Sequence, residues 1–279
     1  MKPLEHYRFG HAARPFSLVV ALVGAALGGW IALLQGQGSV LHLLLIISGA
    51  LLAQLGINLV NDLEDLSLFG AELSGPAASC IRRNARLGFL AFAVALLIGL
   101  YFVLRSGLPL LLLVLFNAVL ALNYNLGPLN FKRRGLALLQ VFLQMGVMLV
   151  FGAYLAMGGE PRWSVIWLSL PVSFLVSLLL LSNELRDYSD DARNGLRTLA
   201  VRLGYARAVW AFRALIAMAC LTALGLYAAD LLARPYYLLL PLLLLPALER
   251  QMREQDRRRL TPLTGRFFLL FGLAYIAAL

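Results

Sequence analysis

Long, uninterrupted apolar runs are the feature that most restricts how this chain can fold. A helix needs about 20 apolar residues to cross about 30 Å of hydrocarbon. Nine runs approach that length, of which the fourth, eighth and ninth are short: 15–34, 40–60, 87–104, 108–122, 136–157, 164–181, 206–227, 236–248 and 267–279. They lack the two-residue alternation of barrel strands. We therefore expect an all-α, polytopic membrane bundle of about nine transmembrane helices.

The basic residues indicate how such a bundle is oriented. Twenty of the 24 lysines and arginines lie in the N-terminal arm or in the joints after the second, fourth, sixth and eighth runs. By the positive-inside rule these parts face the cytoplasm. We expect a multi-pass protein of the cell inner or plasma membrane, with a retained first span and a cytoplasmic N-terminus. The alternation with apolar runs also argues against nucleic acid as a partner, despite a net charge of +10.

Seven of the fourteen acidic residues lie in two short segments, each directly after a long apolar run. The segments read Asn58-x-x-Asn61-Asp62-x-Glu64-Asp65 and Asn183-Glu184-x-Arg186-Asp187-x-x-Asp190-Asp191. Both contain Asn-x-x-x-Asp-x-x-Asp, and their host runs are the second and the sixth. This recurrence suggests one domain, residues 1–279, with an internal repeat of two four-helix halves.

The spacing of the acids predicts a cation site. Positions three and four apart share a helix face, so Asp62 lies beside Asp65, and Asp187 beside Asp190 or Asp191. Two carboxylates about 4 Å apart repel by about 4 kcal/mol at an effective dielectric near 20. Mg²⁺ binds one or two carboxylates and shares its remaining positions with phosphate oxygens. One acidic helix end would usually be solvated surface, but two matching ones favour a magnesium site.

Neither histidine nor cysteine adds to this chemistry in the sequence. His6, His11 and His42 form no cluster, and Cys80 and Cys220 have no metal-type spacing. Zinc or triad chemistry based on histidine is therefore disfavoured. An ion-coupled transporter remains an alternative of a different class, because intramembrane acids and internal repeats suit transporters too. Transporter acids tend to lie at the midplane, whereas these lie at cytoplasmic helix ends.

At the two acidic segments the chain resembles the UbiA superfamily of intramembrane aromatic prenyltransferases, which carry two aspartate-rich motifs on nine helices. Asn61-Asp62-x-x-Asp65 matches the core of the first motif, and Asp187-x-x-x-Asp191 matches the second. Two further segments resemble the menaquinone branch of 1,4-dihydroxy-2-naphthoate polyprenyltransferases. They are Gly195-x-x-Thr198-Leu199-Ala200-Val201-Arg202-Leu203-Gly204, and Tyr124-x-x-Gly127-Pro128 followed by Gly135-Leu136. The resemblance extends from about Arg14 to beyond Gly204.

The resemblance implies magnesium-dependent transfer of a polyprenyl group from an allylic diphosphate to a small aromatic acceptor, at a lipid-embedded site. It implies Mg²⁺ binding by Asp62, Asp65, Asp187 and Asp191, with Asn61 and Tyr124 as further catalytic residues. The residues expected to bind the diphosphate are Asn58, Asn183, Arg186, Lys132, Arg197 and Arg82.

Departures from the family pattern concern the acceptor more than the chemistry. The first motif usually has a further downstream Asp, whereas the nearest acid here is Glu72. Ala137-Leu138 stands where Gly-Glu is common, and Leu196 where Lys is common. The acceptor 1,4-dihydroxy-2-naphthoate is therefore the first expectation, with 4-hydroxybenzoate or homogentisate as alternatives. Glu72, Glu184 and Asp190 receive no role.

Overall fold

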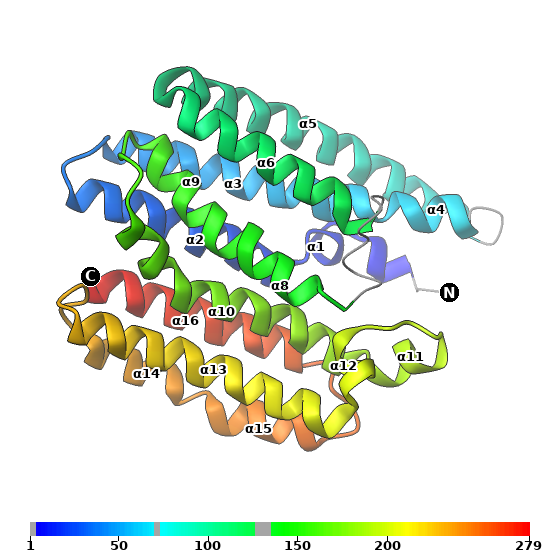
Figure 1. Ribbon diagram of the computed structural model, residues 1–279. Helices are drawn as coiled ribbons and strands as arrows, with labels where there is room; N and C mark the ends of the chain where they lie inside the picture. The colour runs from blue at the N-terminus through cyan, green and yellow to red at the C-terminus, as the bar shows by residue number, and fades with distance from the viewer. Residues whose placement is uncertain (1–3, 70–72, 126–134) are drawn as a thin grey trace.

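The computed structural model describes residues 4–69, 73–125 and 135–279. Within these ranges the regular structure is entirely helical, and the helices run side by side in one bundle (Figure 1). Among the described residues, seven helical stretches are long and apolar enough to cross a membrane: α2 (Pro15–Leu34), α3 with the start of α4 (Val40–Ser67), α5 (Gly75–Ser106), the stretch Ala137–Ala156, α10 (Trp163–Arg186), α13 (Tyr205–Ala228) and α16 (Leu260–Ala278). The stretch Ala137–Ala156 consists of α8 (Ala137–Val141), η2 (Phe142–Met148) and α9 (Leu149–Ala156). The predicted all-α polytopic membrane bundle is confirmed.

The two remaining predicted runs form shorter helices. The fourth run is α6 (Leu108–Asn125). The eighth run is divided into η3 (Pro235–Leu238), α14 (Leu239–Leu242) and α15 (Leu245–Arg253). Pro241 and Pro246 lie in this region, and a proline lacks the amide hydrogen that continues a helix. The division into two four-helix halves stays a prediction.

One helix boundary differs markedly from the prediction. The third run was expected to begin at residue 87, but α5 begins at Gly75. The side chain of Ser74 accepts a hydrogen bond from the Ala77 amide, and Pro76 lies in the first turn; both features start a helix. Arg82, which we expected in a loop with Arg83 and Arg86, therefore lies on the helix.

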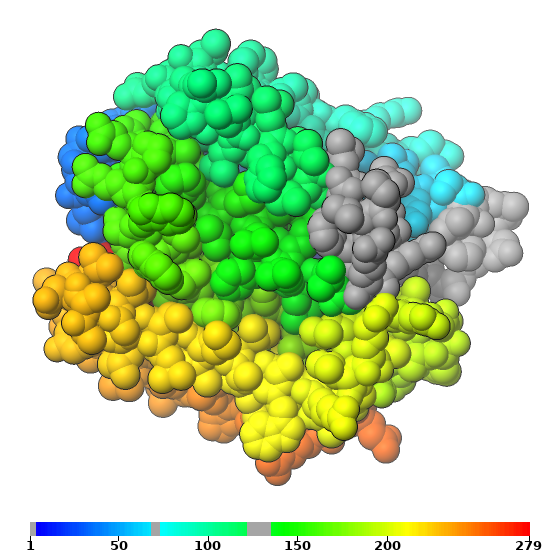
Figure 2. Space-filling model, viewed as in Figure 1, coloured from blue at the N-terminus to red at the C-terminus, as the bar shows by residue number. Residues whose placement is uncertain are grey.

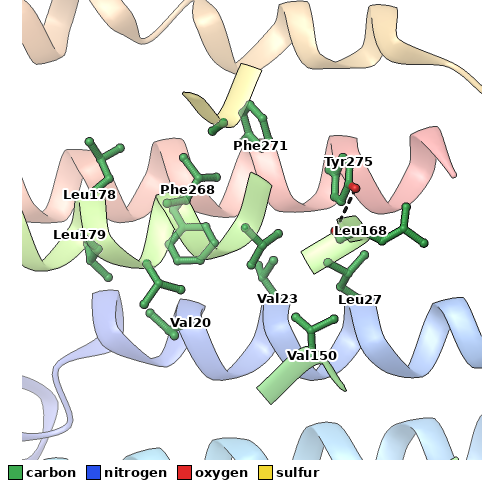
Figure 3. Close-up of a cluster of buried hydrophobic side chains, with 14 of the residues drawn as sticks. Val20, Val23, Leu27, Val150, Leu168, Leu178, Leu179, Phe268, Phe271 and Tyr275 are labelled. Carbon is green, nitrogen blue, oxygen red and sulfur yellow. Dashed lines mark hydrogen bonds between the residues drawn. The ribbon is translucent and has the colours of Figure 1, made fainter. Parts of the chain in front are cut away.

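The centre of the bundle is formed by α2, α10 and α16, whose apolar side chains interdigitate (Figure 3). The buried residues include Val20, Val23 and Leu27 of α2, Leu178 and Leu179 of α10, and Phe268, Phe271 and Tyr275 of α16. The Tyr275 hydroxyl donates to the Leu168 carbonyl at 2.9 Å. Because lipid is as apolar as leucine, such close packing and internal hydrogen bonds hold membrane helices together.

Apolar side chains also cover the outside of the bundle. Both α6 and α13 lie on the face shown in Figure 2. The large exposed apolar residues of the bundle include Leu115 and Phe116 on α6 and Leu221 and Leu224 on α13. Soluble proteins rarely expose apolar patches that are this continuous. The surface therefore suits contact with lipid chains.

The acidic segments lie at one end of the bundle. Figure 1 places the N-terminus, η1 (Leu4–Tyr7), α1 (Phe9–Ala12) and α4 (Leu63–Phe69) at this end, together with α11 (Tyr188–Arg193) and α12 (Leu199–Leu203). The C-terminus lies at the other end. The fold thus places both acidic segments, 125 residues apart when counted from Asp62 to Asp187, at the same end of the bundle.

Candidate active site

Asp62 is the buried centre of the first acidic motif. It caps α3 (Val40–Asn61), and its side chain is only 2% exposed. Arg14, which directly precedes α2, donates from Nη2 to Asp62 Oδ1 at 2.9 Å. The second oxygen, Oδ2, is buried and has no hydrogen-bond partner among the described residues. A buried carboxylate oxygen without a partner is a ready ligand for a cation.

The N-terminal segment completes this region. The Tyr7 hydroxyl donates to Asp65 Oδ2 at 3.2 Å, and burial together with the charge of Asp65 raises the pKa of Tyr7 to about 12. The phenol therefore keeps its proton at neutral pH. His6, Asp62 and Asp65 each offer a ligand atom within 4.8 Å of the others. The sequence analysis missed this grouping because His6 lies 56 residues before Asp62 and no local spacing links them.

The asparagines of the first motif have different surroundings. Asn58 is buried, and its Nδ2 donates to the Ala13 carbonyl at 2.8 Å and to Ser17 Oγ at 2.7 Å. Its Oδ1 accepts from Gln54 at 3.1 Å. Asn58 therefore fastens α3 to the segment around the start of α2, and its amide hydrogens are engaged within the protein. Asn61 is exposed at the end of α3.

Asp187 holds the equivalent position in the second motif. It caps α10 and is followed at once by α11. Arg186 donates to both carboxylate oxygens, from Nε at 2.7 Å and from Nη2 at 2.6 Å. Arg186 Nη1 also donates to Thr261 Oγ1 of α16 at 3.3 Å. This arginine therefore orients Asp187 and ties the motif to the last helix.

The other acids of the second motif differ in their contacts. Glu184 is buried and accepts from the Ala200 amide at 3.0 Å, which fastens α10 to α12. Asp190 is exposed and pairs with Arg193. Asp191 is partly buried, and Asn183 on the last turn of α10 is partly buried too. Glu184 thus has a structural contact that the sequence did not assign.

The remaining predicted residues are more peripheral or are not described. Arg82 is exposed on α5, and Arg197 is exposed before α12. Lys132 and Glu72 lie outside the described residues. Tyr124 lies in the last turn of α6, and its side chain is also outside what the structure describes.

An apolar cavity of about 210 Å³ lies among α3, α5, α6 and α9. Small residues open it, including Gly49, Gly99 and Gly152. Gly49 precedes Asp62 by 13 residues on the same helix, which corresponds to about 20 Å at 1.5 Å per residue. The cavity therefore lies deep in the membrane-spanning part, on the side away from the acids.

Comparison with known families decides what kind of protein this is. The UbiA prenyltransferase family matches residues 17–273, which is nearly the whole chain. The chain belongs to this family. The assignment made from the two acidic motifs is confirmed, and this UbiA family member is a membrane-embedded prenyltransferase.

Several relatives share moderate identity with this UbiA family member. The 1,4-dihydroxy-2-naphthoate octaprenyltransferase of Bacillus subtilis is 27% identical over 76% of this chain and 71% of its own length. The Escherichia coli protein of the same name is 28% identical over 90% of this chain and 86% of its own. UbiA prenyltransferase domain-containing protein 1 of Xenopus tropicalis is 27% identical over 95% of this chain and 79% of its own.

Solved structures share the fold. A UbiA homolog from Aeropyrum pernix aligns with a TM-score of 0.67 at 19% identity, covering 99% of both chains. A UbiA homolog from Archaeoglobus fulgidus, bound to GPP and Mg²⁺, aligns with a TM-score of 0.61 at 16% identity, covering 99% of this chain and 100% of the other. At these identities the likeness concerns the fold.

Proposed function

We propose that this prenyltransferase uses Mg²⁺ to transfer a polyprenyl group from an allylic diphosphate to an aromatic acceptor, with 1,4-dihydroxy-2-naphthoate as the first candidate. The observation that carries the proposal is the buried Asp62 carboxylate, whose Oδ2 has no partner among the described residues and which lies beside Asp65. The Archaeoglobus fulgidus neighbour bound to GPP and Mg²⁺ supports the ligand class. The two naphthoate octaprenyltransferases support the acceptor.

The donor set fits magnesium. Asp62 and Asp65 supply carboxylate oxygens from α3 and α4, and Asp187 and Asp191 supply them from the α10–α11 junction at the same end of the bundle. Magnesium prefers oxygen donors and shares its coordination with phosphate. When bound, it neutralises the charge that develops on the leaving diphosphate, an effect of several kcal/mol.

The chain's own residues position both reactants. Arg186 and Arg14 hold Asp187 and Asp62 in place through ion pairs. Arg186, Arg197, Arg82 and Lys132 are proposed to bind the diphosphate, since guanidinium and ammonium groups match phosphate oxygens. Asn61 and Asn183 are proposed to bind phosphate or orient the carboxylates, and Asn58 to keep α3 against the start of α2. Tyr124 is proposed to face the allylic cation.

The reaction then needs no protein nucleophile. The bond between the allylic carbon and the diphosphate oxygen breaks, and the electron-rich ring forms the new carbon–carbon bond. With 1,4-dihydroxy-2-naphthoate the acceptor loses its carboxylate as CO₂ and keeps both hydroxyl groups, which gives the hydroquinone demethylmenaquinol and free diphosphate. The apolar cavity among α3, α5, α6 and α9 is proposed to take part of the prenyl tail, since its lining is apolar.

The proposal includes an orientation and a location. The acidic end of the bundle is placed on the cytoplasmic side of the inner or plasma membrane, because most basic residues of the sequence flank it. The other acceptors, 4-hydroxybenzoate and homogentisate, use the same chemistry. They remain candidates because Ala137, Leu138 and Leu196 depart from the naphthoate pattern.

The test is a transfer assay on the purified protein in detergent, with Mg²⁺, a labelled prenyl diphosphate and the three acceptors. We expect prenylated product from one acceptor together with release of pyrophosphate. Asp62→Ala and Asp187→Ala should each lower turnover at least about 100-fold, which corresponds to about 2.7 kcal/mol of transition-state stabilisation. Asp256→Ala is the control, because Asp256 is an exposed acid paired with Arg258.

Two results would contradict the proposal. Absence of product with every acceptor would refute the proposed reaction. Near-normal turnover in both the Asp62 and the Asp187 variant would refute the assignment of these residues to the magnesium site, although the reaction itself would stand.

A further inference from the structure

A nitrogen donor reaches the first acidic motif from the N-terminal segment. We infer that His6 is a third protein ligand of the cation held by Asp62 and Asp65, and that it makes this position bind Mn²⁺ and Co²⁺ more tightly than Mg²⁺. The inference rests on the proposed function only in that the same carboxylates bind the cation. Asp62 and Asp65 were predicted as ligands from the sequence, whereas His6 was not.

The distances suit a common ligand sphere. One ligand atom from each of His6, Asp62 and Asp65 lies within 4.8 Å of the other two. Metal bonds to imidazole nitrogen and carboxylate oxygen are about 2.0–2.2 Å long, so two ligands on opposite sides of an ion lie about 4.0–4.4 Å apart. Sub-ångström movements would therefore bring all three atoms into contact with one ion.

The burial of Asp62 is a second reason to expect a bound cation at this position. Its side chain is 2% exposed, and Oδ2 has no hydrogen-bond partner among the described residues. Arg14 contacts only the other oxygen, Oδ1. A buried carboxylate oxygen without a hydrogen-bond partner is unfavourable, and a bound cation would offset that cost.

Tyr7 holds the neighbouring residue His6 in place. The Tyr7 side chain is 2% exposed and packs with Ala77 and Ile81 of α5. Its carbonyl accepts from Asn84 Nδ2 at 2.8 Å, and its hydroxyl donates to Asp65 at 3.2 Å. The rings of His6 and Tyr7 meet edge to face, with centroids 5.2 Å apart. His6 is thus carried on an anchored turn that includes a bond to one of the acids.

An imidazole changes which metal the site prefers. Magnesium favours oxygen donors and keeps its water molecules, whereas imidazole suits first-row transition metals. Affinity for a site with a nitrogen donor rises from Mn²⁺ to Co²⁺ along the usual order of these metals. Arg14 balances the charge of Asp62 when no cation is bound. The combination predicts a site that works with Mg²⁺ and binds Mn²⁺ or Co²⁺ more strongly.

Pulsed electron paramagnetic resonance of the Mn²⁺-loaded full chain, with any affinity tag removed, tests the ligand directly. We expect ¹⁴N modulation from a coordinated imidazole in the native protein, replaced by a ¹⁵N pattern after labelling with ¹⁵N-histidine. His6→Gln should lose the signal. His11→Gln should keep it, because His11 is an exposed histidine of the same segment. Absence of nitrogen coupling in the native protein, or its persistence in His6→Gln, would overturn the inference.

Titration with each metal tests the preference. His6→Gln should weaken Mn²⁺ and Co²⁺ binding at least about tenfold, which is about 1.4 kcal/mol, and Mg²⁺ binding by less than about threefold. Asp62→Asn should weaken all three. Equal weakening of Mg²⁺ and Mn²⁺ binding in His6→Gln would overturn the preference. Because the ¹⁵N experiment uses the native sequence, it shows that a histidine is a ligand even if His6→Gln folds poorly. Retention of the signal in His11→Gln then excludes His11, and His42 lies 20 residues before Asp62 at the start of α3, about 30 Å away at 1.5 Å per residue.

The outcome can be separated from that of the transfer assay. A nitrogen signal that depends on His6, with no product from any acceptor, would support the ligand and refute the proposed reaction. Product formation with Mg²⁺ and no nitrogen signal would support the reaction and refute the ligand.

Discussion

Removing the guanidinium of Arg14 should destabilise the metal-free protein, because Asp62 would lose its ion-pair partner while remaining buried. Arg14 Nη2 lies 2.9 Å from Asp62 Oδ1, and the side chains are 30% and 2% exposed. With charge centres about 4 Å apart, the attraction is about 4 kcal/mol at an effective dielectric near 20. Breaking a buried pair costs about 3–5 kcal/mol, and the partial exposure of Arg14 lowers our expectation for Arg14→Gln to about 2–3 kcal/mol.

The assay is thermal unfolding in detergent with a chelator, followed by tryptophan fluorescence. For a chain of this size, 1 kcal/mol corresponds to about 2–4 °C, so Arg14→Gln should lower the midpoint by about 4–12 °C. The control is Arg193→Gln, which breaks an ion pair whose side chains are 76% and 69% exposed. Exposed pairs contribute about 0–1 kcal/mol, so this control should change the midpoint little.

A double-mutant cycle with Asp62→Asn tests whether the pair itself is responsible. The double variant should be less destabilised than the sum of the single variants, since no charge then remains buried without a partner. Millimolar Mg²⁺ should restore part of the stability of Arg14→Gln, because a bound cation replaces the lost charge. If Arg14→Gln behaves like Arg193→Gln, or if the two substitutions are additive, the reasoning is refuted.

Two further predictions concern packing and pH. A Cβ at Gly28 would lie 2.0 Å from the Val150 carbonyl oxygen, so Gly28→Ala should lower the free energy of unfolding by about 1–3 kcal/mol. The control is Gly225→Ala, whose Cβ would meet no atom within 4 Å and which should leave the stability unchanged. Equal unfolding midpoints for the two variants would contradict this prediction. The hydrogen bond from Arg213 lowers the pKa of Glu249, so this pair stabilises the fold above the ordinary glutamate pKa of about 4.3 and ceases to do so as the pH falls through the lowered value. The difference in unfolding midpoint between the native protein and Arg213→Gln should therefore shrink on acidification below about pH 4. A difference that stays constant with pH would contradict the role of the Arg213–Glu249 pair.

The fold class and the family could be predicted from the sequence because their causes are local. Lipid offers no hydrogen bonds to the backbone, so each long apolar run has to form a helix whatever its neighbours are. The two acidic motifs are short and contiguous, and they carry the resemblance to the superfamily, while two further short segments carry the resemblance to the menaquinone branch. Asp62 and Asp187 could therefore be proposed as site residues without knowledge of the packing.

Helix boundaries and breaks were harder to predict, because apolar composition continues through them. The eighth run is uniformly apolar, yet it is interrupted at Leu243 and Leu244, between Pro241 and Pro246. In contrast, α5 extends past its apolar part to Gly75, because Ser74 and Pro76 start the helix in a polar segment. Capping and proline signals were present in the sequence but were outweighed by hydropathy in the prediction.

The partners of the charged groups were decided only by the tertiary structure. Asp62 pairs with Arg14, Asp65 with Tyr7, and Arg213 inside the seventh span with Glu249 on α15. These residues lie 36 to 58 positions apart, so helical periodicity says nothing about them. The sequence determined that acids gather at the ends of two membrane helices, because hydropathy and motifs are properties of short segments. Which side chain pairs with each acidic residue depends on how helices distant in the sequence pack together. This packing exists only in the folded chain.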